Sequence, residues 1–475
     1  MRSSSFLPTI FAGVVFACTA AAAPAPKPVT IPQAVAKIVT AARTSSGAYD
    51  KLRRLCDDVG HRLSGSAQLE SAVDWAVATM KADGHENVRT EPAMVRKWVR
   101  GRESATLLTP REQDLHMLGL GNSVGTPPEG ISAEVVVIKD EADLNAKAAS
   151  VKGKIVLFTY PMKHWDAKGG TGYGDAVKYR VGGPRLAGEL GAVAVLIRSV
   201  TARSLRSPHT GVTLYKDSKI KIPGAALSVE DALLLTRLVE SGKKVVVRLR
   251  MEARDQGEVP SSNVIAELRG REWPEEYVVI GGHLDSWDVG QGAHDDGAGV
   301  VHAMEALTLL RRLDLRPRRT VRVVLWTNEE NGGAGAAAYA QAHAADLPRH
   351  VAAIESDTGG FLPLGFGVEL KDPIAQAQAS RALRALLGSM RPLKLGKVID
   401  GASGADVGPL VEAGVPGMML LVDDSKYFDY HHSEADTFDK VDPVALAEGT
   451  AAMAAMAYIL AERPERLDRP VNHRR

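Results

Sequence analysis

One glycine-rich stretch past the middle of the chain constrains the fold more than any other feature of the sequence. It opens with the apolar run 277–280, which is typical of a buried strand and leads into His283 and Asp285. After several glycines it reaches Asp295 and Asp296, and an apolar run with the periodicity of a helix follows. This order of a predicted strand, a loop with possible metal-binding side chains and a predicted helix indicates one half of a metal site.

Further possible metal ligands lie downstream. Glu329 and Glu330 follow one apolar run, Asp357 follows another, and His432 precedes an Asp-Thr pair. Each has a structural alternative, since a Glu-Glu pair after a strand is usually a solvated turn and a short Asp-Thr-Gly segment is usually a turn or a helix cap. Their joint occurrence, in order and at strand ends, favours a metal site. Oxygen and imidazole donors without thiolates suit zinc.

The arrangement also suits two metal ions. Such a site needs ions roughly 3.5–4 Å apart, a carboxylate that bridges them and a base beside the water that they share. Asp295, at a glycine-flanked turn, is the natural bridge, and Asp285 or a neighbour could orient the His283 ring. Adjacent side chains diverge past a strand end, so one of Glu329 and Glu330 could bind metal while the other acts as the base.

From residue 262 onward, strand-like and helix-like runs alternate to the C-terminus. This alternation predicts an α/β fold with a mixed, largely parallel sheet flanked by helices. Functional loops then belong at the carboxyl ends of the strands, where His283, Glu329 and Asp357 fall. Two helical patterns between residues 31 and 84 precede this region.

Between residues 116 and 252 the chain changes character. The strand-like segments are short, two helices interrupt them, and no acid and histidine cluster of the metal-binding type occurs. Because 475 residues exceed the size at which one core keeps growing, we expect a second domain here. It interrupts a catalytic domain formed by residues 24–115 and 253–475. The glycine-rich segment 168–174 is expected to be a mobile surface loop.

The N-terminus has the pattern of a targeting signal. Arg2 precedes the apolar run 6–17, and small residues follow it. We therefore expect residues 1–23 to be a signal peptide and the mature protein to be exported, either secreted or periplasmic. Cys18 also permits a lipoprotein anchor, but Phe16 two residues before it fits that pattern poorly. We find no further run long enough to span a bilayer.

Composition excludes other classes of protein. The formal net charge of +1 argues against an electrostatic nucleic-acid binder. After removal of the signal peptide Cys56 is the only cysteine, so no intramolecular disulfide can form. We expect Cys56 to pack as a small apolar residue on a helix. His294 and His302 have no obvious partner, and we expect them to be solvated or packed and not to bind metal.

Taken together, the motifs resemble the co-catalytic di-zinc exopeptidases of the carboxypeptidase Q type, also called plasma glutamate carboxypeptidase. The motifs that carry this resemblance are residues 282–296, 325–330, 355–357 and 427–437. It extends to segments outside the predicted site, among them residues 60–66, 125–130 and 207–211. The resemblance implies that residues 116–252 are a β-rich protease-associated domain inserted into the catalytic domain.

The resemblance implies a ligand set for two zinc ions per chain. One ion would be held by His283, Asp295 and Asp357. The other would be held by Asp295, Glu330 and His432. The choice of His432 over its neighbour rests on the family's spacing of three residues between the ligand and Asp-Thr.

The remaining functional positions follow from the same resemblance. Glu329 would be the general base, and Asp285 would orient His283. The peptide bond between Asp295 and Asp296 would be cis. Relatives often carry a tyrosine just before the ligand histidine; here His431 stands in its place, and its role stays open.

The predicted function is that of a secreted di-zinc metallo-exopeptidase. It would hydrolyse dipeptides or short peptides through a zinc-activated bridging water, with a glutamate as general base. One alternative is an aminopeptidase that acts on longer peptides, and another is a non-catalytic binding or receptor homologue, against which the complete donor set argues. The resemblance also implies a homodimer, and nothing in the sequence points to a nucleic-acid partner.

Overall fold

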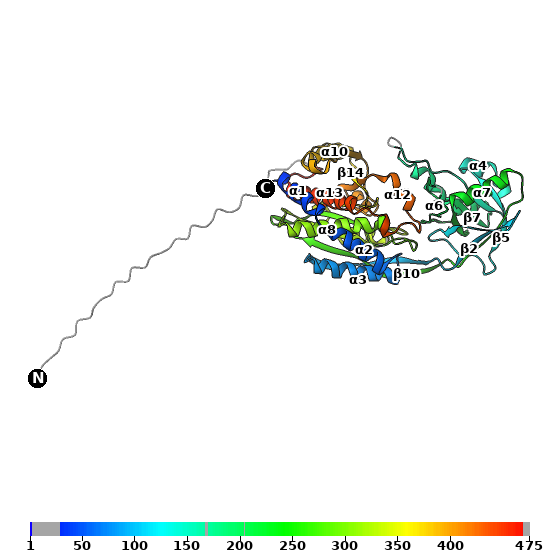
Figure 1. Ribbon diagram of the computed structural model, residues 1–475, viewed down its shortest axis with the longest axis horizontal. Helices are drawn as coiled ribbons and strands as arrows, with labels where there is room; N and C mark the ends of the chain where they lie inside the picture. The colour runs from blue at the N-terminus through cyan, green and yellow to red at the C-terminus, as the bar shows by residue number, and fades with distance from the viewer. Residues whose placement is uncertain (2–28, 167–169, 204, 469–475) are drawn as a thin grey trace.

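The computed structural model describes residue 1 and residues 29–166, 170–203 and 205–468. It contains two eight-stranded sheets, which occupy the two lobes seen in Figure 1. The predicted signal peptide, the end of the C-terminal tail and part of the predicted loop at 168–174 lie outside the described residues.

The first sheet is mixed. Its strands, in spatial order, are β1 (Glu86–Val99), β10 (Arg254–Leu268), β12 (Arg319–Trp326), β11 (Trp273–His283), β13 (His350–Glu355), β16 (Gly417–Val422), β14 (Pro363–Glu369) and β15 (Lys397–Asp400). The four central strands β12, β11, β13 and β16 run parallel. Strand β1 pairs antiparallel with β10, β10 pairs antiparallel with β12, and β14 pairs antiparallel with β16. The predicted α/β class with a mixed, largely parallel sheet is confirmed.

Helices cover both faces of this sheet. They are α1 (Ile31–Arg43), α2 (Gly47–Arg54), α3 (Ala67–Ala82), α8 (Ala298–Arg312), α9 (Ala334–Ala342), α10 (Pro373–Leu387), α11 (Gly408–Glu412), α12 (Tyr427–Tyr430) and α13 (Pro443–Glu462). Because side chains alternate along a strand, Val278 and Ile280 pack with α8 and α13, while Val279 packs on the other side with α9 and α11.

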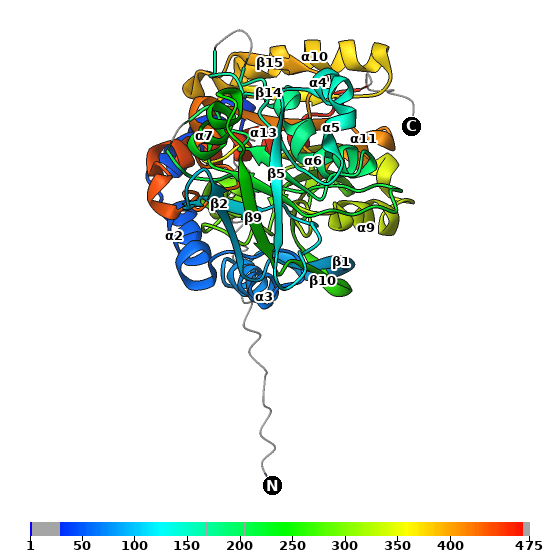
Figure 2. The same ribbon diagram turned by 90° about the vertical axis from the view of Figure 1, so that its right-hand side faces the viewer.

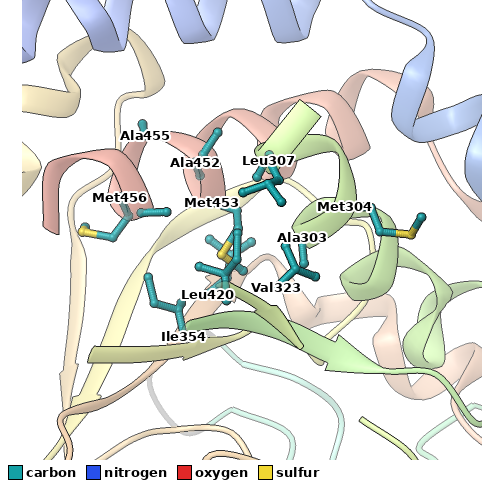
Figure 3. Packing of buried hydrophobic residues seen from close by; sticks show 14 of the residues in the cluster. Ala303, Met304, Leu307, Val323, Ile354, Leu420, Ala452, Met453, Ala455 and Met456 are labelled. Carbon is teal, nitrogen blue, oxygen red and sulfur yellow. The ribbon is translucent and has the colours of Figure 1, made fainter. Parts of the chain in front are cut away.

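The apolar helix α13 lies at the centre of the larger core. Figure 3 shows its residues Met453 and Met456 with Leu307 of α8 above the sheet residues Ile354 and Leu420. In the described part of the chain α13 is the one helix long and apolar enough to cross a membrane, but 83% of that window is buried inside the protein. Its hydrophobicity is therefore that of a core helix.

The second sheet contains parallel and antiparallel pairs. Its strands, in spatial order, are β3 (Gln113–Leu115), β2 (Glu103–Thr109), β9 (Val246–Met251), β5 (Ile131–Ile138), β6 (Ile155–Phe158), β7 (Ala194–Arg198), β8 (Gly224–Leu227) and β4 (Met117–Gly119). Its helices are α4 (Glu141–Ala146), α5 (Ala148–Val151), α6 (Tyr173–Glu189) and α7 (Val229–Glu240). Figure 2 turns this lobe toward the viewer, with β2, β9 and β5 in front.

The second sheet begins earlier in the chain than the boundary expected at residue 116. Strand β2 pairs antiparallel with β9, and Leu107 and Leu115 are buried in the core of the second lobe. The chain therefore leaves the first sheet after Val99 and returns to it at Arg254. We call residues 103–251 the second sheet unit.

Candidate metal centre

His283, the last residue of β11, lies in the interior of the site. Its side chain is fully buried, and its Nδ1 donates a hydrogen bond to the backbone carbonyl oxygen of Asp285 at 3.0 Å. Nε2 then lies 3.3 Å from Oδ1 of Asp295 and 3.3 Å from Oδ1 of Asp357. A hydrogen bond from the second ring nitrogen is the usual way in which a protein orients a metal-binding histidine.

The carboxylate of Asp285 organises the glutamate pair. Its Oδ1 accepts from the backbone N–H of Glu329 at 3.0 Å, and its Oδ2 accepts from that of Glu330 at 3.3 Å. The hydroxyl of Ser64 donates to Oδ2 at 3.0 Å. Oδ1 is 3.8 Å from Nδ1 of His283, so Asp285 orients that ring through its carbonyl oxygen and the glutamates through its side chain.

Asp295 lies between two groups of donor atoms. Its Oδ1 faces Nε2 of His283 at 3.3 Å, and its Oδ2 faces Nε2 of His432 at 3.2 Å. The Asp295–Asp296 peptide bond is cis, as expected. The carboxylate of Asp436 holds this turn, because it accepts from the backbone N–H groups of Asp295 at 3.1 Å and of His294 at 2.8 Å.

His432 and Glu330 complete the second group. Nε2 of His432 lies 3.1 Å from Oε2 of Glu330, and both side chains are more than nine-tenths buried. Donor atoms of His283, Asp295 and Glu330 lie within 4.8 Å of one another. The structure thus brings all five predicted ligand residues together, with Asp295 between the two halves.

The donor atoms fit metal ions. Oε1 of Glu330 is buried and has no hydrogen-bond partner among the described residues, and Oδ2 of Asp295 is buried with Nε2 of His432 facing it at 3.2 Å. A buried carboxylate oxygen without a partner costs free energy that a bound cation would recover. The donors are oxygen and nitrogen atoms, as zinc sites built from histidine and carboxylate require.

The electrostatics of the site point the same way. Burial, reinforced by Asp295, raises the pKa of Glu330 to about 7. Burial and the neighbouring acids Asp357 and Glu330 raise the pKa of Glu329 well above its usual value. Although burial opposes the protonated ring of His432, Glu330 and Asp295 raise its pKa to about 10. Crowded buried carboxylates repel one another, and a positive ion between them relieves that repulsion.

Other histidines near the site have different environments. His294 is fully buried and stacks on Phe361 with ring centroids 4.3 Å apart, so of the two expected environments, solvated or packed, it has the packed one. His431 stacks on His432 at 3.5 Å, and its Nε2 lies 3.8 Å from Oδ2 of Asp295. His431 therefore lies beside the predicted metal ligands but is not one of them.

Sequence reasoning missed the contacts that reach the site from the second sheet unit. The carbonyl oxygen of Thr210 lies 3.3 Å from Nδ1 of His432, and Nη1 of Arg180 also lies 3.3 Å from that nitrogen. A backbone carbonyl has no sequence signal, and more than 200 positions separate the partners. In the sequence, only the family resemblance distinguishes the segment 207–211.

The chain is similar to known peptidases. Residues 263–459 match peptidase family M28. Carboxypeptidase Q from Mus musculus is 41% identical over 439 residues, which cover 92% of this chain and 91% of the mouse protein. The protein of the same name from Homo sapiens is 40% identical and covers 92% of this chain and 90% of its own.

The chain is also similar to solved structures. The peptidase M28 precursor from Shewanella amazonensis SB2B is 38% identical, has a TM-score of 0.87 and covers 93% of this chain and 98% of its own. An aminopeptidase from Aneurinibacillus sp. strain AM-1, 20% identical, has a TM-score of 0.63 over 92% of this chain and 98% of its own, and thus shares the fold.

The fold and the clustered carboxylates and histidines define a metallopeptidase. Within that class, the chain belongs to peptidase family M28 and to the group of carboxypeptidase Q.

Proposed function

We propose that this protein is an exported di-zinc exopeptidase that hydrolyses dipeptides or short peptides. The observation that carries the proposal is the position of Asp295, whose two carboxylate oxygens face His283 and His432 at 3.3 Å and 3.2 Å. One short side chain shared between two donor groups is the arrangement that a pair of metal ions requires.

Two zinc ions would be held by the five clustered side chains. His283, Asp295 and Asp357 would bind one ion, and Asp295, Glu330 and His432 would bind the other. When bound, zinc supplies a Lewis acid that lowers the pKa of water and polarises the scissile carbonyl group.

Glu329 is the proposed proton carrier. Its side chain is partly exposed, unlike that of Glu330, so it can meet both water and substrate. It would accept the proton of the attacking water at a carboxylate oxygen and then deliver that proton to the leaving amine nitrogen. Asp285 would keep Glu329 in place, since its Oδ1 accepts from the backbone N–H of Glu329.

The choice of peptide end rests on the relatives. The similarity to carboxypeptidase Q over 92% of the chain supports recognition of a free carboxylate end. An aminopeptidase is the other outcome of the test, because the likeness to solved aminopeptidases extends to the fold alone. The proposed signal peptide at residues 1–23 would place this activity outside the cytoplasm.

The deciding experiment combines metal analysis with a substrate panel. We expect the purified protein to contain close to two zinc ions per chain and to lose activity with a strong chelator. The panel compares free dipeptides, N-blocked dipeptides and C-amidated dipeptides. Loss of activity on amidated substrates supports the carboxypeptidase, and loss on N-blocked substrates shows an aminopeptidase. Full activity without metal would overturn the proposal.

A further inference from the structure

A short segment of the second sheet unit, His209–Thr210–Gly211, lies against the two histidines of the metal centre. The ring Nδ1 of His209 donates to the carbonyl oxygen of His431 at 2.6 Å. The backbone N–H of Thr210 donates to the carbonyl oxygen of His432 at 2.9 Å. The carbonyl oxygen of Thr210 faces Nδ1 of His432 at 3.3 Å. Both the backbone and the ring of His432 are therefore held by residues outside the first sheet.

The backbone of His432 needs such support. Its φ is +60°, in the left-handed region that residues with a side chain rarely adopt. A residue in this conformation persists where its surroundings hold it in place. His209 bonds the carbonyl oxygen that precedes His432 in the chain, and Thr210 bonds the carbonyl oxygen of His432 itself. The two hydrogen bonds therefore restrain the backbone on both sides of the His432 Cα.

The ring of His432 has the same source of support. When Nε2 faces the metal centre, Nδ1 carries the remaining proton and needs an acceptor. The carbonyl oxygen of Thr210, 3.3 Å away, is the acceptor in reach of that proton. Nη1 of Arg180, which can only donate, lies 3.3 Å from the same nitrogen and donates to the Thr210 oxygen at 3.4 Å.

The 209–211 segment is itself fixed within the second sheet unit. The backbone N–H of His209 donates to Oγ of Ser199 at 2.8 Å, and the hydroxyl of Thr210 donates to the carbonyl oxygen of Gly119 at 2.7 Å. Gly211 has a φ of +136°, and a Cβ there would collide with the Arg180 guanidinium group. The close approach of Arg180 therefore requires glycine.

We infer that the 209–211 segment is a positioning element for the metal ligand His432, and that His209 is its key side chain. The inference rests on the proposed function, in which His432 binds one of two zinc ions. The second sheet unit would then set the zinc affinity of a site to which it contributes no proposed ligand.

The test compares zinc binding by His209→Phe and His209→Asn in the full-length protein. The phenylalanine keeps a ring but has no donor, so we expect about 10- to 100-fold weaker binding at one of the two zinc positions. The asparagine amide can donate from near the place of Nδ1, so we expect affinity within a few-fold of the parent. Competition against a chromogenic chelator gives the affinities. The visible spectrum of the cobalt-substituted protein reports the coordination at that position.

His116→Phe is the matched control, because this histidine lies in the same sheet unit and contacts Asp231. It should leave both affinities unchanged. If circular dichroism shows that His209→Phe does not fold, His209→Ala replaces it. A folded variant without the donor that binds both zinc ions as the parent does would overturn the inference. A parent protein that binds no zinc would overturn the proposed function instead, which keeps the two failures distinct.

Discussion

Glu329 and Glu330 are neighbours in the chain, yet the site gives them different environments. The side chain of Glu330 is buried against His432, whereas Glu329 is partly exposed. Asp285 holds Glu329 through a hydrogen bond from the backbone N–H of Glu329. We expect Glu329→Gln to keep its zinc and to lose about 10²- to 10⁴-fold in kcat, because the base is removed while the shape is kept. Zinc analysis and steady-state kinetics on a dipeptide measure both effects.

Glu330→Gln is the paired variant. It should bind less zinc at one position, since a carboxylate ligand is lost. The reverse pattern, with zinc lost from the Glu329 variant and retained by the Glu330 variant, would show that the two roles are exchanged.

The sequence identified side chains that the fold brings together, but it did not identify the groups that hold them in place. His283, Glu329 and Asp357 could be predicted because each follows an apolar run, and parallel strands bring such positions to one edge of a sheet. The Thr210 carbonyl could not be predicted, since every residue carries a carbonyl and only the folded chain decides which one is used.

At the scale of elements, helices α2, α3 and α8 meet at a buried charge cluster. Nζ of Lys51 lies 2.5 Å from Oε2 of Glu305 and 2.9 Å from Oδ2 of Asp83, and less than a tenth of the lysine side chain is exposed. We expect Lys51→Met to lower the free energy of unfolding by about 3–5 kcal/mol, because it leaves Glu305 charged, buried and without its cation. Urea denaturation followed by circular dichroism measures the change.

The double variant Lys51→Met/Glu305→Met separates charge from packing. Replacing a buried ion pair with apolar side chains of similar size is often nearly neutral. The double variant should therefore be more stable than Lys51→Met alone. A single variant as stable as the parent would show that this cluster contributes little.

Helices and strands could be predicted where the pattern that marks them lies within the segment itself. The alternation of apolar runs predicted β11, α8 and β12. One of the two helical patterns expected between residues 31 and 84 corresponds to α3, whose buried face includes Leu69, Ala72 and Met80. The expected boundary at residue 116 left β2 and β3 outside the second domain. Their place in its sheet depends on the pairing of β2 with β9, which lies more than 130 residues later. Pairing across such a distance depends on the folded sheet, and the strand sequence itself does not identify its partner.

At the scale of the whole molecule, the second sheet unit sits at the end of the first sheet that carries the metal centre. Arg203 Nε bonds Oδ1 of Asp429 at 3.0 Å, and the Trp165 indole donates to Oδ1 of Asp424 at 2.9 Å. Both acids belong to the stretch that leads to His432. We propose that this unit, as an inserted protease-associated domain, restricts access to the site from one side.

This arrangement and the proposed homodimer lead to a prediction about substrate length. A site covered by the second sheet unit, and narrowed further by a partner subunit, would admit short peptides and exclude long chains. We expect a dimer by light scattering and a kcat/KM that falls steeply as the substrate is lengthened from two to ten residues. Substrates of equal terminal sequence but different length serve as the matched series, since terminal recognition is then constant. A monomer that cleaves long polypeptides as fast as dipeptides would contradict both parts, whereas a monomer with the same length preference would assign the restriction to the second sheet unit alone.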